Sequence, residues 1–278
     1  MLLTRAEHVE IDGVPLATPA WEVLDASGLY DAPPVRGEDL VVPHLEGAVA
    51  ARRVLDARRV TLGMVVYGDR DPEGAAYADP RAGLVANLDL LKRAVVRPVQ
   101  SSVEGTRALR HHLPGGAVRS APCHVLGPLQ LGAMGPASAL ATLDVVVPGG
   151  VLRDEVATVA GPAEFTGAGE LVVANPGSAD QFEVVLELSG TATSVRVRNT
   201  TWDPSGGTWL ELGGSLGGGV VIDTGAWTAV RDGLSVVGLV AHAGHERWLP
   251  LVPGDSVLRI EPEVGDVALT VTHHAGYL

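Results

Sequence analysis

Hydrophobic residues recur along this chain in two patterns, and each pattern predicts a different secondary structure. Between residues 80 and 97 they are spaced by four, three and four, which places them on one face of an α-helix. These residues are Leu84, Leu88, Leu91 and Val95. Asp79 can cap the helix, Pro80 suits its first position, and Pro98 ends it. We therefore predict one helix, over residues 80–97, with an apolar face packed on a sheet.

The rest of the first half contains short runs of β-branched and aliphatic residues, which predict strands. We expect these strands at residues 9–14, 21–24, 40–42, 59–67 and 141–147. The segment Ser120–Leu143 has no charged side chain, which raises the question of a membrane span. Its prolines and glycines interrupt it too often for a lipid-spanning helix, so we predict strands and a loop there.

The second half alternates apolar and polar residues in short runs, and turns rich in Gly, Pro, Asn and Asp separate most of these runs. In residues 182–188 the even positions are all apolar, whereas Glu183 and Glu187 face the other way, as in a half-buried antiparallel strand. The expected strands are 171–174, 181–188, 194–198, 208–212, 220–223, 247–252, 256–260 and 267–273. This spacing predicts a β-sandwich or barrel, so the whole chain is expected to be mainly β.

Charge and pattern both change near the Pro148-Gly149-Gly150 turn. Residues 1–150 carry a net charge of −3, and residues 151–278 carry −10. We therefore predict two domains, 1–150 and 151–278.

Composition limits the classes of function. Apolar residues make up 46% of the 278 residues, which excludes disorder as the main state. The single cysteine, Cys123, excludes a disulfide framework and predicts a reduced thiol. A net charge of −13 argues against binding to nucleic acid through phosphate neutralisation. The first residues reach charge at once, so we expect no export signal and no membrane association.

Candidate catalytic and metal-binding residues do not form a known constellation. The pairs His111-His112 and His273-His274 are adjacent, and neighbours on a strand point to opposite faces. His242 and His245 have no metalloprotease glutamate between them. The residues around Ser235 are one residue too long for a G-x-S-x-G nucleophile motif. The glycine-rich segment 213–219 lacks the lysine of a phosphate loop. Cys123 is expected to pack in the core. We predict no catalytic, cofactor-binding or metal-binding residues and no cofactor, and thus not an enzyme.

Aromatic residues leave one alternative open. Trp202, Trp209 and Trp227 lie close together in sequence and could form a sugar-stacking surface, although core packing is the commoner use of tryptophan in a sandwich. A glycosylation sequon at Asn199 is attributed to chance.

Several short motifs resemble the distal tail (Dit) proteins of long-tailed phages and of phage-tail-like particles. In the first half, residues 28–36 (Gly-Leu-Tyr-Asp-Ala-Pro-Pro-Val-Arg) and then 56–62 (Asp-Ala-Arg-Arg-Val-Thr-Leu) are similar to the N-terminal turn and strand of that family. In the second half, residues 175–179, 221–224 and 247–255 resemble its later turns and strands, with Asp255 in place of the usual asparagine. The motifs follow one another in the family's order along nearly the whole chain.

The resemblance implies an N-terminal β-sandwich-like domain with one helix, which closes into a six-fold ring around the tail channel. It also implies a C-terminal galectin-like β-sandwich. The expected role is a structural virion component, an adaptor ring that joins the tail tube to the tail-tip hub and leaves a channel for DNA. The implied partners are five further copies, the tail tube protein, the tail-tip hub protein, and receptor-binding or tape-measure proteins, in a virion tail assembled in the host cytoplasm.

Two other functions remain open from the residues alone. The tryptophans and the sandwich pattern favour a carbohydrate-binding module as the first alternative. An esterase or glycosidase on a β-rich scaffold is the second.

Overall fold

A computed structural model of the chain describes residues 7–37, 54–95, 107–243 and 249–278. The chain forms two compact units: unit 1 comprises Met1–Leu152 with Leu278, and unit 2 comprises Arg153–Tyr277. Each unit has its own hydrophobic core, and the described part of the chain is mainly β with a single α-helix, as the sequence predicts. The expected strand at 40–42 lies outside the described residues.

Unit 1 is built on an antiparallel sheet in which seven strands follow the order β2-β1-β7-β8-β9-β6-β3. Its strands are β1 (His8–Ile11), β2 (Val14–Pro15), β3 (Trp21–Ser27), β6 (Arg58–Tyr67), β7 (Arg107–His112), β8 (Val118–Met134) and β9 (Ser138–Val147), with β4 (Val35–Arg36) and β5 (Val54–Leu55) paired apart from them. The long strands β6 and β9 pair from Arg58↔Val147 to Tyr67↔Ser138. This ladder forms the middle of the sheet.

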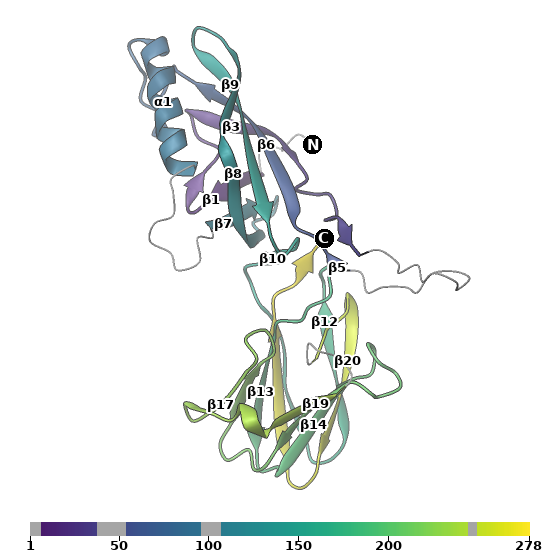
Figure 1. Ribbon diagram of the computed structural model, residues 1–278. Helices are drawn as coiled ribbons and strands as arrows, with labels where there is room; N and C mark the ends of the chain where they lie inside the picture. Colours follow the sequence, from purple (N-terminus) through teal and green to yellow (C-terminus); the bar gives the residue numbers. More distant parts are fainter. Residues whose placement is uncertain (1–6, 38–53, 96–106, 244–248) are drawn as a thin grey trace, which may run out of the picture. The chain divides into compact units, whose positions relative to one another are not determined.

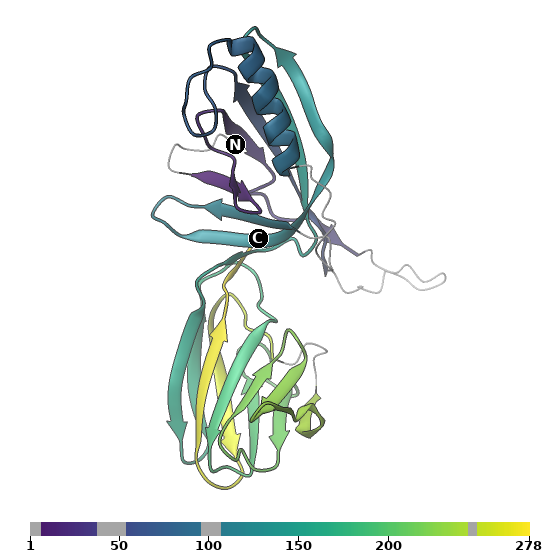
Figure 2. The same ribbon diagram turned by 90° about the vertical axis from the view of Figure 1, so that its left-hand side faces the viewer.

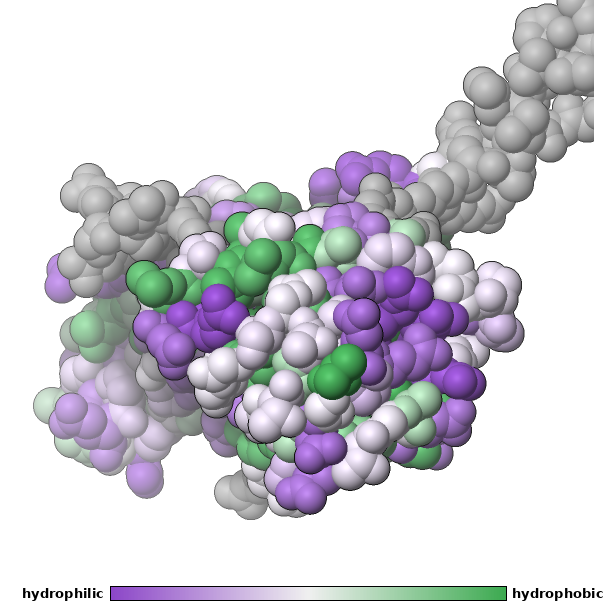
Figure 3. Space-filling view, turned by 90° about the horizontal axis from the view of Figure 1, so that it is seen from below, coloured by the Kyte–Doolittle hydropathy of each residue, from purple (hydrophilic) through white to green (hydrophobic). Residues whose placement is uncertain are grey.

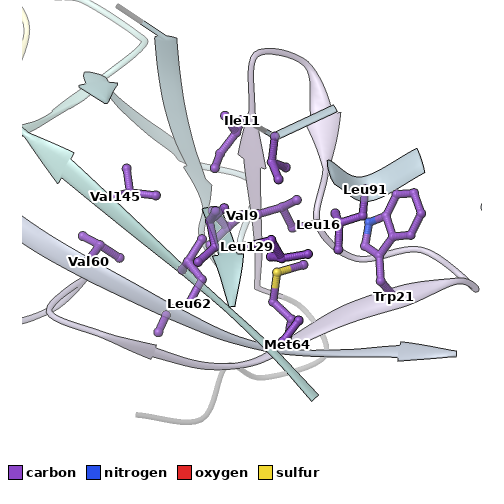
Figure 4. Packing of buried hydrophobic residues seen from close by; sticks show 14 of the residues in the cluster. Val9, Ile11, Leu16, Trp21, Val60, Leu62, Met64, Leu91, Leu129 and Val145 are labelled. Atoms are coloured by element: carbon purple, nitrogen blue, oxygen red, sulfur yellow. The ribbon is translucent and has the colours of Figure 1, made fainter. Parts of the chain in front are cut away.

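Alternate residues of these strands point into a single interior, as the period of two requires. Buried side chains of β6 and β9, such as Leu62 and Val145, meet Val9 of β1, Leu129 of β8 and Trp21 of β3 there (Figure 4). Helix α1 (Pro80–Val95) lies along this sheet (Figures 1 and 2).

Helix α1 forms where the sequence predicts it. The Asp79 carboxylate accepts a hydrogen bond from the backbone N–H of Arg81 at 2.9 Å, which caps the first turn. The whole predicted stripe is buried, from Leu84 to Val95. A Cβ at Gly83 would lie 2.3 Å from the carbonyl oxygen of Gly68, so only glycine allows this close approach. The expected last residues of the helix, 96–97, lie outside the described part.

Two buried polar side chains complete the packing of α1. Asn87 donates to the carbonyl oxygens of Tyr67 and Arg70, each at 2.7 Å. Arg107 donates to the carbonyl oxygens of Ala94 and Val95 at 3.1 and 2.8 Å, and thus satisfies acceptors at the negative end of the helix. In the described residues no helix is both long and apolar enough to cross a membrane.

Unit 2 contains two antiparallel sheets, with a hydrophobic core formed by residues of both (Figure 1). One sheet has the order β11-β21-β13-β16-β17-β18, and the other has β12-β20-β14-β15-β19. The bounds are β11 (Thr158–Phe165), β12 (Gly169–Asn175), β13 (Val184–Gly190), β14 (Ser194–Asn199), β15 (Trp209–Gly213), β16 (Val220–Asp223), β17 (Thr228–Arg231), β18 (Leu234–Ser235), a 3₁₀ turn η1 (Val237–Leu239), β19 (Val240–Ala243), β20 (Gly254–Pro262) and β21 (Val267–His273). The short strands β10 (Leu152–Asp154) and β22 (Gly276–Tyr277) pair with each other outside these two sheets.

The alternation predicted for the second half is confirmed in β13. Val184, Leu186 and Leu188 are buried, whereas Glu187 is exposed. The strand begins at Val184, three residues later than expected.

The expected strand at 247–252 is wrong for residues 249–252, the part of it that the structure describes. Leu249–Val252 forms only an isolated bridge between Leu251 and Gln181. Pro250 has no N–H to donate to a ladder, and its carbonyl oxygen instead accepts from the side chain of Asn199 at 2.6 Å. The segment is therefore held by this side chain and by one backbone bridge rather than by a strand ladder.

Candidate functional site

The uncharged segment of the sequence forms a long hairpin in unit 1. Residues 118–123 of β8 pair with β7, and residues 124–134 pair with β9 instead. We call residues 126–140, the outer part of this hairpin, the arm. It contains no charged residue. The prediction of strands and a loop for this segment is confirmed.

The arm exposes large apolar side chains on both of its faces. Leu131 is 41% exposed and is paired with Ala141, so the two share one face. Leu140 is 49% exposed and, as the neighbour of Ala141 on the strand, points to the opposite face. Leu126 and Met134 are exposed to a similar degree. An apolar hairpin exposed on two sides is a surface that association would bury.

The pairing of β8 is irregular along the arm. The ladder of β7 with β8 is described from Arg107, opposite Cys123, to His112, opposite Val118, and residues 96–106 lie outside the described part. Pro128 and a register shift between Leu126 and Gln130 interrupt the ladder of β8 with β9. Folded proteins usually protect exposed strands with charged side chains, and the arm has none.

Two hydrogen bonds join the tip of the arm to the rest of unit 1. The Arg81 guanidinium, in the first turn of α1, donates to the carbonyl oxygen of Gly135 at 2.9 Å. The backbone N–H of Gly68 donates to the carbonyl oxygen of Ala137 at 2.8 Å. Within the tip, the N–H of Gly135 donates to the carbonyl oxygen of Ser138, also at 2.8 Å. Helix α1 therefore positions the arm.

His111 and His112 point to opposite faces of β7, as the alternation predicts. His111 is buried beside Tyr30, whose hydroxyl lies 3.1 Å from its Nε2, and burial lowers the pKa of His111 to about 4. His112 points to the other face, where its ring stacks on His8 at 4.0 Å and lies near Glu10. In unit 2, His273 is buried.

The structure also places the other candidate residues, His242, Cys123 and Asn199. His242 lies on β19, and its sequence neighbour in the motif, His245, is outside the described residues. Cys123 is buried in the core, as expected, and burial raises the pKa of its thiol to about 12, which disfavours the nucleophilic thiolate. Asn199 of the sequon is buried, and its amide holds Pro250. Within the described residues no three His, Cys, Asp or Glu side chains form a metal-binding group.

The expectation of core packing for the tryptophans of unit 2 is wrong. Trp202 and Trp209 are only partly buried, and Trp227 is 47% exposed. The core is filled by aliphatic side chains of the two sheets instead. Trp209 lies on the outer face of its sheet, where the Arg196 guanidinium is 4.8 Å from its ring centroid.

The outer faces of the two sheets of unit 2 carry different kinds of side chain. The face of β14, β15 and β20 carries ion pairs between Arg196 and Glu211 and between Arg198 and Glu261. On the other sheet, Val221 and Val230 form an exposed cross-strand pair. In the space-filling view of unit 2, hydrophobic side chains gather beside strongly polar ones (Figure 3).

No family model matches the chain, and no curated protein matches it. Solved structures do match. The Dit protein of phage SPP1, described as a paradigm of the hub adsorption apparatus in phages that infect Gram-positive bacteria, covers 97% of this chain and 99% of its own, with a TM-score of 0.65 and 14% identity. The baseplate of phage P2 in its activated conformation covers 95% and 97%, with a TM-score of 0.37 and 9% identity, too distant to add to the argument. The chain thus has the fold of a Dit protein, as its motifs imply.

Proposed function

We propose that the chain is a structural component of a phage tail, an adaptor ring between the tail tube and the tail-tip hub. The observation that carries this proposal is the arm, an uncharged and exposed hairpin fixed on unit 1. A closed ring repeats one heterologous interface, in which a surface of one copy fits a different surface of the next. The arm supplies an apolar surface for one side of such an interface.

The fold supports the same role. The similar structure is a phage Dit protein described as part of a hub adsorption apparatus, and it matches the chain from end to end. We infer six copies, a channel that leaves room for DNA, and contacts with the tail tube, the hub, and receptor-binding or tape-measure proteins. The protein is then part of the virion tail and acts as structure rather than as an enzyme.

The charge distribution assigns different tasks to the two units. Residues 1–150 are nearly balanced at −3, whereas residues 151–278 carry −10 and would repel their own copies at short range. We therefore assign the ring to unit 1 and a peripheral position to unit 2, with the galectin-like architecture.

Light scattering on the full chain and on fragments 1–152 and 153–278 tests this assignment. We expect six copies for the full chain and for the first fragment, and one copy for the second, at concentrations high enough to populate a weak ring. Self-association confined to the second fragment would contradict the assignment.

A second prediction concerns DNA, which has to pass through the channel without being held. A net charge of −13 leaves too little clustered positive charge for binding by counterion release. We expect no shift of duplex DNA by the full chain in a gel at about 0.15 M salt. Binding at that salt that weakens as salt is added would argue against a channel of this kind.

A further inference from the structure

The outer face of the six-stranded sheet of unit 2 carries no arginine or lysine. This sheet faces the viewer in Figure 2, with β21 in yellow between β11 and β13. Arg231 is the one such residue in its six strands. It points away from the face of its neighbour Val230 and donates to the carbonyl oxygen of Ser215. The side chains that face outward are largely β-branched, among them Val159, Val185, Val221, Val230, Thr270 and Thr272.

Val221, Val230 and Glu187 lie side by side on this face. Val221 of β16 is the cross-strand partner of Val230 on β17 and, on its other side, of Glu187 on β13. Directly opposed residues of antiparallel strands have Cβ atoms about 4.5–5.5 Å apart, so their side chains touch. The two valines are 43% and 37% exposed, and Glu187 is exposed as well. An aliphatic pair and a carboxylate therefore form one continuous surface.

Glu187 has no ion-pair partner among the described residues, and neither does Glu164 of β11, which faces outward from the same sheet. The arginines of unit 2 that form ion pairs have other partners: Arg153 with Glu183, Arg196 with Glu211, and both Arg198 and Arg259 with Glu261. The five-stranded sheet thus neutralises the charges of its own outer face. The six-stranded sheet leaves its carboxylates uncompensated beside exposed valines.

We propose that the face centred on Val221, Val230 and Glu187 docks a basic segment of another tail protein, where the assignment to a tail rests on the proposed function. An arginine or lysine of the partner fits because its methylene groups can lie on the two valines while its charged head pairs with Glu187. A second copy would bring the same carboxylates, and the net charge of −10 over residues 151–278, against this face. Nucleic acid is disfavoured by the same sign of charge.

Glu170 provides a matched control within the same unit. It is exposed on β12, two residues from Val172, and faces outward from the five-stranded sheet. Glu170→Lys and Glu187→Lys change the net charge of unit 2 by the same amount. A general effect of charge on binding would appear in both variants, whereas docking on the proposed face depends on Glu187 alone.

The test is calorimetric titration of the full chain with two probes, the purified tail-tip hub protein and the purified receptor-binding protein of the same tail. We expect the wild type to bind one of them, and Glu187→Lys and Val221→Lys each to weaken that binding at least about tenfold. Glu170→Lys should change it less than about twofold. All three positions are exposed, so thermal unfolding should stay unchanged.

Light scattering on the same samples tests the ring separately, so failure of the ring and failure of this docking face appear in different measurements. We expect Glu187→Lys to leave the number of copies unchanged. A changed number of copies would place a second copy on the face and overturn the proposal. Binding of neither probe by the wild type, or equal weakening by Glu187→Lys and Glu170→Lys, would overturn it as well.

Discussion

Replacing Leu88 with aspartate is expected to leave unit 1 unfolded or insoluble. Leu88 is 4% exposed in the middle of the apolar stripe of α1, which packs into the core of the unit. Burying a carboxylate there without a partner costs several kcal/mol, a large share of a typical stability of about 5–15 kcal/mol. Soluble yield and thermal unfolding of the full chain measure the effect.

The same helix provides the controls. Val85 is 51% exposed, so Val85→Asp introduces the same charge on the solvent side of α1. Arg93, near the end of the helix, is exposed as well. We expect Val85→Asp and Arg93→Ala to stay within about 0.5 kcal/mol of the wild type. If Leu88→Asp behaved like these two variants, the stripe would not be a core face.

Replacing both Leu131 and Leu140 with glutamate is expected to abolish the ring without unfolding the chain. Both residues are more than two-fifths exposed, so each carboxylate remains in water in the single copy. In the proposed ring the arm is buried, and each unpaired charge there would cost several kcal/mol. Because about 1.4 kcal/mol corresponds to a tenfold change, the loss of affinity should exceed about a hundredfold.

Val172 provides a matched substitution outside the arm. It is 54% exposed on β12 of unit 2, and Val172→Glu adds the same charge to an equally accessible apolar position. We expect this variant to form the ring as the wild type does. Unchanged thermal unfolding of the double variant shows that it is folded.

Local features of the chain were the most predictable from sequence. The helix could be placed because capping, spacing and its terminating proline all act within a few residues. The strand predicted at 181–188 overlaps the observed Val184–Gly190 for the same reason, since its alternation is a local property. The charge-free stretch of the arm is also visible in the sequence, but the exposure of its side chains depends on its long-range pairing in the sheet.

Features that depend on distant partners could not be predicted. Arg107 is buried because it meets the carbonyl groups at the end of α1, and nothing in its own neighbourhood signals this. The segment 249–252 has the composition of a strand, but it forms one isolated bridge with Gln181 and accepts a side-chain hydrogen bond from Asn199 instead of joining a ladder. Core packing is the commoner expectation for Trp202, Trp209 and Trp227, but aliphatic side chains of the two sheets fill the core of unit 2 instead. Trp227 in particular lies in a turn whose left-handed backbone has no sequence signal of its own.

The most direct test of the ring is the mass of the full chain in solution, compared with that of the variant carrying Leu131→Glu and Leu140→Glu. Multi-angle light scattering at one concentration, with both proteins shown to be folded by thermal unfolding, gives the number of copies. The account predicts six copies for the wild type and for Val172→Glu, and one copy for the double variant. Equal masses for the wild type and the double variant would contradict it.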